Sequence, residues 1–227
     1  YSIEVQPLLF IAGGGRFGSE AVKAAETKGW RALVVDVDAA SKASKIARQV
    51  DFVVGDAISL ALALMLNGIV PRFFVPAIPG HFAGELVSQY LQHLGVSPAP
   101  EGSLAQRAAN LLPSDVVLGV DPRRGLLIAS YMPPGMLCKV PCHQPARCPV
   151  TGKLREMPMH QLLQTKLSSL ARLYVLESVL LAPMVGGFRG RQLARVLRDL
   201  SRVQRGAHVA VATSCKCHAI VSFFTVK

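Results

Sequence analysis

The chain has 227 residues, a formal net charge of +11 and a hydrophobic content of 51%. This length allows a substantial buried core and either one large or two small domains. The high apolar content and the low share of charged residues exclude an intrinsically disordered chain. The longest apolar run, at 57–66, is too short to span a bilayer and therefore predicts a buried helix.

The chain opens with a pattern typical of a dinucleotide-binding unit. An apolar run breaks into a glycine loop in which Gly13, Gly15 and Gly18 have the spacing G-x-G-x-x-G, with Arg16 and Phe17 before the last glycine. The first glycine of this motif permits a tight turn, and the second lets the backbone approach a pyrophosphate. The third lets the following helix pack against the strand. We therefore expect these five residues to bind a cofactor.

The segment after the glycine loop fits the same unit. Residues 17–29 suit a helix that Gly29 stops, and a short β-rich run at 32–35 ends at Asp36. An acid at the tip of the second strand binds the ribose of NAD and repels the additional phosphate of NADP. The pattern predicts NAD(H) as the cofactor, although Asp38 is close enough to be the relevant acid. The alternative is a parallel-sheet unit whose glycines serve only packing.

The first part of the chain also resembles the nucleotide-binding domain of potassium-transport regulators, the TrkA-N or regulator-of-conductance type. The resemblance is carried by the G-x-G-R-x-G loop at 13–18, by the acid Asp36, and by the tripeptide GDA at 55–57. It implies a Rossmann-type domain that binds NAD(H) or another adenine nucleotide, with Asp56 among the binding residues. It covers about a third of the chain, so potassium regulation is not implied.

Beyond residue 68 the organisation changes. We expect a strand at 72–78 with Pro76 near its end, an amphipathic helix at 82–94, and a domain boundary in the Pro- and Gly-containing stretch 95–103. The predicted fold class is α/β, with a Rossmann-type parallel sheet in a dinucleotide-binding domain (1–98) and a C-terminal α+β domain (99–227) that carries the cysteines. The strands expected in the second domain lie at 115–120, 125–131, 173–181, 208–213 and 220–226.

A helix expected at 189–205 carries arginines on one face. With the charge of +11, this stripe could bind nucleic acid or an acidic partner. A solvated helix face is the ordinary role of such a charge run, and no aromatic platform or known nucleic-acid motif accompanies it, so nucleic acid is not an expected partner. The stripe consists of Arg191, Arg195, Arg198, Arg202 and Arg205.

All five cysteines lie in two short segments, a proline-rich loop and the end of a β-like run. Thiolates that converge from two such segments suit a soft metal. The spacings within the loop match neither a ferredoxin loop nor the paired C-x-x-C knuckles of a zinc ribbon. An iron–sulfur cluster, a zinc ion, and reduced or redox-active thiols without metal therefore remain open. The candidate ligands are Cys138, Cys142, Cys148, Cys215 and Cys217, and His143, His160 or His218 could replace one of them.

Two function classes follow from these features. The first is a redox enzyme or electron-transfer component that binds a nicotinamide cofactor on the glycine loop and uses the cysteines as a cluster or redox thiol. The second is a non-catalytic nucleotide sensor with a structural metal. No catalytic residue is assigned, because no familiar hydrolase, zinc-protease or P-loop motif is present and nothing pairs His81 with an acid. We expect a cytoplasmic protein that binds an adenine dinucleotide, does not insert into a membrane, and could form a homodimer.

Overall fold

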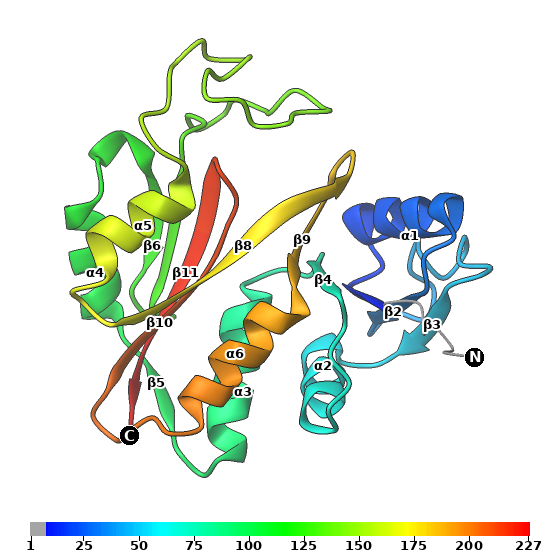
Figure 1. Ribbon diagram of the computed structural model, residues 1–227, viewed down its shortest axis with the longest axis horizontal. Coiled ribbons are helices and arrows are strands. Elements are labelled where there is room, and N and C mark those ends of the chain that lie inside the picture. The colour runs from blue at the N-terminus through cyan, green and yellow to red at the C-terminus, as the bar shows by residue number, and fades with distance from the viewer. Residues whose placement is uncertain (1–7) are drawn as a thin grey trace, which may run out of the picture. The chain divides into compact units, whose positions relative to one another are not determined.

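The computed structural model describes residues 8–227, which form two compact units (Figure 1). The first unit comprises the described part of Tyr1–Phe82 together with Val179–Arg195, and the second comprises Ala83–Ser178 and Val196–Lys227. The chain therefore leaves the first unit and later returns to it. The boundary expected at residue 98 lies inside the second unit, at the short strand β5 (Pro98–Pro100).

A parallel sheet with the strand order β3-β2-β1-β4 forms the centre of the first unit, and β9 pairs antiparallel with β4. The apolar strand β1 is buried along its whole length, as is usual for a parallel strand that is covered on both faces. This sheet confirms the predicted α/β fold class. Its strands are β1 (Leu9–Ala12), β2 (Ala32–Asp36), β3 (Asp51–Val54), β4 (Phe73–Pro76) and β9 (Val185–Arg189).

Two helices connect these parallel strands. Helix α1 (Arg16–Lys28) follows β1, buries Ala21, Val22 and Ala25, and ends at Gly29 in the left-handed conformation that caps helices. Helix α2 (Ala57–Leu66) spans the residues expected for a buried helix, but only one side of it is buried and Leu66 is 44% exposed.

Four phenylalanines form an aromatic cluster in the first unit. The ring centroid of Phe74 lies 5.4 Å from that of Phe10, 5.6 Å from that of Phe82 and 5.6 Å from that of Phe188. None of these side chains is more than 2% exposed. Phe82 lies within 6.4 Å of the same rings, so Phe74 makes the shorter contacts in a cluster that both residues join.

The second unit contains a sheet with the order β8-β10-β11-β7-β6, in which β5 also pairs with β11. Strand β8 belongs to the second unit up to Ser178 and to the first from Val179. All five strands expected from the sequence are present, with shifts of one or two residues at their ends. They are β6 (Val117–Asp121), β7 (Leu126–Ser130), β8 (Arg172–Ala182), β10 (His208–Ser214) and β11 (His218–Val226).

Helices α4 (Gly102–Leu111) and α5 (Met159–Leu167), which the sequence patterns did not predict, supply the core of the second unit. Their side chains Leu104 and Leu163 are buried in one cluster with Phe223 of β11. Helix α3 (Phe82–His93) has nearly its expected bounds, whereas α6 (Gly190–Leu200) is shorter than expected. None of the helices formed by residues 8–227 has the length and apolar character needed to cross a membrane.

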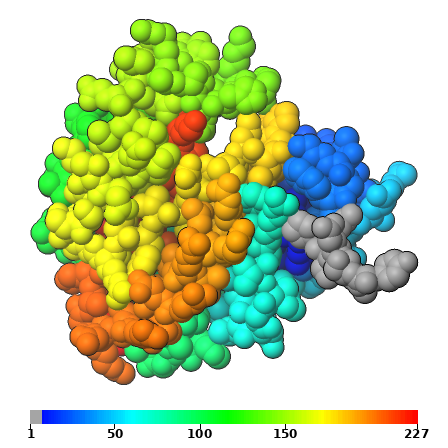
Figure 2. Space-filling model, in the orientation of Figure 1, coloured from blue at the N-terminus to red at the C-terminus, as the bar shows by residue number. Residues whose placement is uncertain are grey.

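A long loop at 131–158 separates β7 from α5. The β-pairing described within this loop is a single isolated antiparallel bridge between Arg147 and Leu154. The loop extends past the turn between β10 and β11, and Figure 2 shows its atoms beside the tip of that hairpin. This position brings both cysteine segments to one end of the second unit.

We expect Phe74→Ala to lower the free energy of unfolding by about 3–5 kcal/mol, because it removes a fully buried ring and leaves a cavity. Val37→Ala is the matched control: Val37 is 74% exposed, so its truncation should change stability by less than about 0.5 kcal/mol. Denaturant unfolding of both variants measures the difference. Equal stability losses would contradict the central role of Phe74.

His81 should make folding sensitive to acid. It is 2% exposed just before α3, and burial lowers its pKa from 6.5 to about 3. The unfolded chain binds a proton below about pH 6.5 while the folded chain does not, so stability decreases as the pH falls from about 6.5 toward 3. We expect His81→Gln to reduce this decrease by an amount on the order of a few kcal/mol. The control His93→Gln replaces an exposed histidine and should change stability by less than about 0.5 kcal/mol.

Candidate nucleotide site and thiol site

The predicted nucleotide residues lie at one edge of the parallel sheet, where its four strands end. Gly13 N donates to Val35 O at 2.8 Å, and Ala77 N donates to Ala12 O at 2.8 Å. Gly55 N donates to Asp36 O at 2.9 Å. Ligands of open α/β sheets bind beyond the carboxyl ends of the strands, so this edge is the expected place for a cofactor.

The three glycines of the motif have separate roles. Gly13 has φ +95°, and a Cβ atom there would lie 2.6 Å from Ala77 O. A Cβ atom on Gly18 would lie 1.8 Å from Gly13 O, so only glycine lets α1 approach the loop this closely. At Gly15 a Cβ atom would meet no atom of residues 8–227 within 4 Å, and the residue is exposed. Packing therefore requires Gly13 and Gly18, while the space beside Gly15 is open to a ligand.

The amino end of α1 offers an environment that suits an anion. Gly15 is the N-cap residue, and no side chain in the described part of the chain caps the helix. Arg16 and Phe17 are both exposed, and the Arg16 Cζ atom lies 5.7 Å from the centroid of the Phe17 ring. The positive end of the helix dipole and the guanidinium group both favour a phosphate at this position.

The Asp36 carboxylate joins the tip of β2 to the glycine loop. Its Oδ2 accepts a hydrogen bond from Gly14 N, and its Oδ1 accepts one from Asp38 N at 2.8 Å. A carboxylate has about four acceptor positions, so Asp36 retains capacity for the hydroxyl groups of a ribose. Asp38 instead accepts from Ala40 N at 2.8 Å within its own turn. Asp36 is therefore the acid beside the loop.

Sequence reasoning missed the segment that covers Gly14. A Cβ atom on Gly14 would lie 2.5 Å from Ser41 Oγ, and Ala43 N donates to Gly14 O at 2.8 Å. Ser41 and Ala43 are both buried. The signal was Gly14 itself, the middle glycine of three in a row, because the G-x-G-x-x-G motif does not require glycine at that position.

Asp56, which the family resemblance placed among the binding residues, has a structural role. It is the N-cap residue of α2, and its Oδ1 accepts a hydrogen bond from Ser59 N at 2.7 Å. Such a cap stabilises a helix by about 1 kcal/mol. Asp56 is exposed at the same sheet edge as the glycine loop.

The two cysteine segments meet in the second unit, and all five cysteines are free thiols. Cys138 Sγ lies 3.8 Å from His218 Nε2, and Cys215 Sγ lies 3.6 Å from His218 Nδ1. The side-chain amide nitrogen of Gln144, Nε2, donates to Cys215 Sγ at 3.0 Å. Contacts thus connect the loop at 131–158 to the turn between β10 and β11.

Backbone N–H groups donate to three of the sulfur atoms. Cys142 Sγ accepts from Gln144 N at 3.4 Å, and Cys148 Sγ accepts from Thr151 N at 3.5 Å. Cys215 Sγ accepts from the N–H groups of the second and third residues after it, at 3.4 and 3.3 Å. Hydrogen bonds of this kind stabilise a thiolate relative to a thiol.

These surroundings divide the thiols by acidity. Burial acts to raise the pKa of Cys215, but the hydrogen bonds from His218 and from backbone N–H groups outweigh it and bring the pKa to about 7. Hydrogen bonds from Thr151 lower the pKa of Cys148. Burial raises the pKa of Cys217 to about 11, and burial together with neighbouring thiols raises that of Cys138.

Arg155 holds the two cysteine segments together. Its guanidinium group donates to Lys216 O at 2.6 Å, to Gln144 O at 2.7 Å and to Pro145 O. Gln144 adds a second link, because its side-chain oxygen accepts from Lys216 N at 3.1 Å. Sequence reasoning missed both residues, since neither is a usual metal ligand or catalytic group.

Within residues 8–227, no group of three or more His, Cys, Asp or Glu side chains lies close enough together to hold a metal ion as the side chains stand. Of the histidines considered as substitutes, His218 lies among the thiols, His143 is exposed, and His160 lies in α5. A cavity of about 290 Å³ adjoins the site, and its walls include Tyr131, Cys148 and Arg155.

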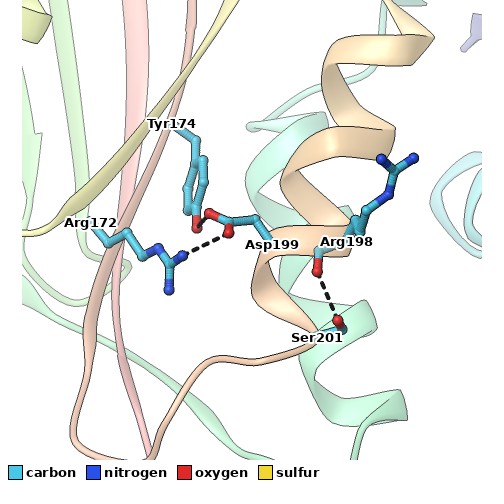
Figure 3. A network of polar contacts seen from close by, with 5 residues as sticks. All are labelled: Arg172, Tyr174, Arg198, Asp199 and Ser201. Atoms are coloured by element: carbon cyan, nitrogen blue, oxygen red, sulfur yellow. Dashed lines mark hydrogen bonds and ion pairs between the residues drawn. The ribbon is translucent and has the colours of Figure 1, made fainter.

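The arginine stripe is shorter in the structure than the sequence predicted. Helix α6 ends at Leu200, so Arg202 and Arg205 lie beyond it. In Figure 3, Asp199 accepts hydrogen bonds from Tyr174 and from Arg172, the latter at 2.7 Å, while Arg198 points away from this network. The hydrogen bond from Tyr174 and the charge of Arg172 lower the pKa of the Asp199 carboxyl group. Asp199 thus adds a negative charge among the arginines.

Comparison with known proteins gives three findings. The AF_1314_C family, described as "Uncharacterized protein, C-terminal domain", matches residues 84–227. An Archaeoglobus fulgidus protein with the description "Uncharacterized protein" is 26% identical over 224 residues, which cover 93% of this chain and 96% of that protein. The N5-carboxyaminoimidazole ribonucleotide synthetase of Thermotoga maritima is 15% identical, with a TM-score of 0.28 over 49% of this chain and 38% of its own. A TM-score this low is no basis for assigning fold or function.

Arg155→Ala should loosen the thiol site, because it removes the donors to carbonyl groups of both cysteine segments. We expect amide hydrogen exchange at 142–148 and 214–218 to become at least about tenfold faster, which corresponds to about 1.4 kcal/mol of local opening free energy. Arg147→Ala is the control, since Arg147 donates to Gly152 O within the loop itself. Unchanged hydrogen exchange at 214–218 in Arg155→Ala would show that Arg155 does not hold the two cysteine segments together.

Proposed function

We propose that this chain, which belongs to the AF_1314_C family, is an NAD(H)-binding protein with a second site built from thiols, and that it acts as an oxidoreductase or electron-transfer component. The observation that carries the proposal is the open space beside Gly15, at the uncapped start of α1. A loop that only served packing would need glycine at Gly13 and Gly18 but not at Gly15.

The residues at this edge fit a dinucleotide. The pyrophosphate would lie against Gly15 and the first N–H groups of α1, with the Arg16 guanidinium as a counter-charge. Asp36 would accept hydrogen bonds from the ribose hydroxyls and would repel the 2′-phosphate of NADP. When bound, the nicotinamide ring supplies hydride-transfer chemistry.

The thiols support the redox part of the proposal. A pKa of about 7 leaves a large share of Cys215 as thiolate at neutral pH, and the thiolate is the form that reacts with oxidants and binds metals. Five free cysteines are typical of a reducing compartment, so the proposal includes a cytoplasmic location.

A nucleotide sensor with a structural metal is the second candidate. It is favoured by the hydrogen bonds of Arg155 and Gln144, which fix the thiols as a link between two parts of the second unit. The colour of the purified protein separates the two functions. A brown protein would indicate an iron–sulfur cluster and favour electron transfer, and a colourless protein that contains zinc would favour the sensor.

Gly15→Val tests the nucleotide site. Its side chain would fill the place of the pyrophosphate without disturbing neighbouring atoms, so we expect folding to persist and the affinity for NAD(H) to fall by more than about tenfold, or 1.4 kcal/mol. Gly119→Val is a matched control, because a Cβ atom at Gly119 also meets nothing within 4 Å and the residue lies in β6. Calorimetric titration measures both. If wild-type protein binds no adenine nucleotide, the proposed site is wrong.

Asp36→Asn tests the choice of cofactor. The asparagine oxygen can keep the hydrogen bond from Gly14 N, while the bond from Asp38 N and the negative charge are lost. We expect the preference for NAD(H) over NADP(H) to decrease by about tenfold, as measured by titration with each cofactor. Equal affinity of the wild-type protein for the two cofactors would contradict the role of Asp36.

A further inference from the structure

We propose that the thiol site holds a single tetrahedral zinc ion, with ligands from both cysteine segments. This inference rests on the second candidate function, the nucleotide sensor with a structural metal, and deepens it by naming the metal, its ligands and a positioning residue. It assigns His218 as the residue that orients two of the ligands, and it excludes Cys217. The four ligands are Cys138, Cys142, Cys148 and Cys215.

Hydrogen bonds to three of the sulfur atoms indicate that these cysteines act as thiolates. Cys142, Cys148 and Cys215 each accept a backbone N–H bond from a residue two or three positions later in the chain. Cys215 also accepts from the Gln144 amide, so three different residues donate to one sulfur atom. A neutral thiol is a weak acceptor, whereas a metal-bound thiolate is stabilised by such outer donors. The turns around these cysteines are therefore built for thiolates.

His218 connects the two cysteine segments, because its imidazole ring lies between a thiol of one segment and a thiol of the other. Its Nε2 is 3.8 Å from Cys138 Sγ, and its Nδ1 is 3.6 Å from Cys215 Sγ. A ring that faces a different sulfur with each nitrogen is placed to orient ligands rather than to be one. Cys138, which shares His218 with Cys215, is therefore assigned as the fourth ligand.

The exclusion of Cys217 follows from its place in the turn. Its N–H donates to Cys215 Sγ, and its carbonyl oxygen accepts from Tyr131 N at 2.9 Å. Among the described residues, backbone N–H–sulfur bonds are directed at Cys215 and not at Cys217. The sequence alone could not distinguish these two cysteines, because they are separated by one residue.

Only the first spacing separates zinc from a ferredoxin-type iron–sulfur cluster. Three residues separate Cys138 from Cys142, within the two to four that are typical of zinc sites, whereas the five residues between Cys142 and Cys148 lie outside that range. Ferredoxin loops have two residues at this point. Since no three of these side chains stand close enough to hold a metal ion, zinc–sulfur bonds of about 2.3 Å require the ligands to draw together, and not Cys138 alone.

Metal analysis of the full chain, purified under anaerobic conditions, tests the site. We expect one zinc ion per chain, and loss of at least nine-tenths of it in each of Cys142→Ser, Cys148→Ser and Cys215→Ser. The matched control Cys217→Ser should retain the zinc, whether or not the ligand variants fold. Bound iron and sulfide, five freely titrating thiols, or equal zinc loss in Cys217→Ser would each overturn the inference.

Cobalt substitution tests the roles of Cys138 and His218, because the visible bands of tetrahedral Co²⁺ depend on the number of sulfur ligands. We expect the spectrum of a four-sulfur site in the wild-type protein and in His218→Ala, with an affinity about 10–100-fold lower in the variant. A three-sulfur, one-nitrogen spectrum in the wild-type protein would make His218 a ligand and overturn the assignment. Titration of the same preparation with NAD(H) shows separately whether the nucleotide half of the proposed function fails.

Discussion

The close approach of α1 to the end of β1 is the contact on which the candidate nucleotide site depends. With no side chain on Gly18, the first turn of the helix lies against the carbonyl group of Gly13. That contact determines where α1 begins and therefore where its unpaired N–H groups and Arg16 lie. The Asp36 carboxylate then holds the next residue of the loop, Gly14. A larger residue at position 18 would displace all of these groups together.

The thiol site depends on a different kind of contact, namely hydrogen bonds to main-chain carbonyl groups. A loop without regular structure has no sheet or helix partners for its carbonyl groups. Near the cysteines, two carbonyl groups of the loop and one of the β10–β11 turn accept hydrogen bonds from the single guanidinium group of Arg155. Charged hydrogen bonds are stronger than neutral ones. One side chain therefore replaces the sheet or helix that would otherwise position these residues.

Local sequence patterns predicted the first unit well, because its main features are each specified by residues that lie close together in the sequence. The bounds of α2, the tip of β2 at Asp36 and the glycine motif could all be read from neighbouring residues. Features that depend on distant partners were missed. Strand β9 is not among the strands expected from the sequence, and it forms because β4 offers it an unpaired edge. Gln144 and Arg155 likewise acquire their roles only when the segment at 215–218 is beside them.

The pairing of β9 with β4 has a consequence for the order in which the chain can fold. A ribosome releases β1 to β4 more than a hundred residues before it releases Phe188, which stacks on Phe74. During that interval, β4 is the edge strand of an incomplete sheet, with one face of its central aromatic ring uncovered. Open apolar edges of this kind promote association between nascent chains. The first unit therefore starts to emerge before the second, but it is completed only after β9 is released.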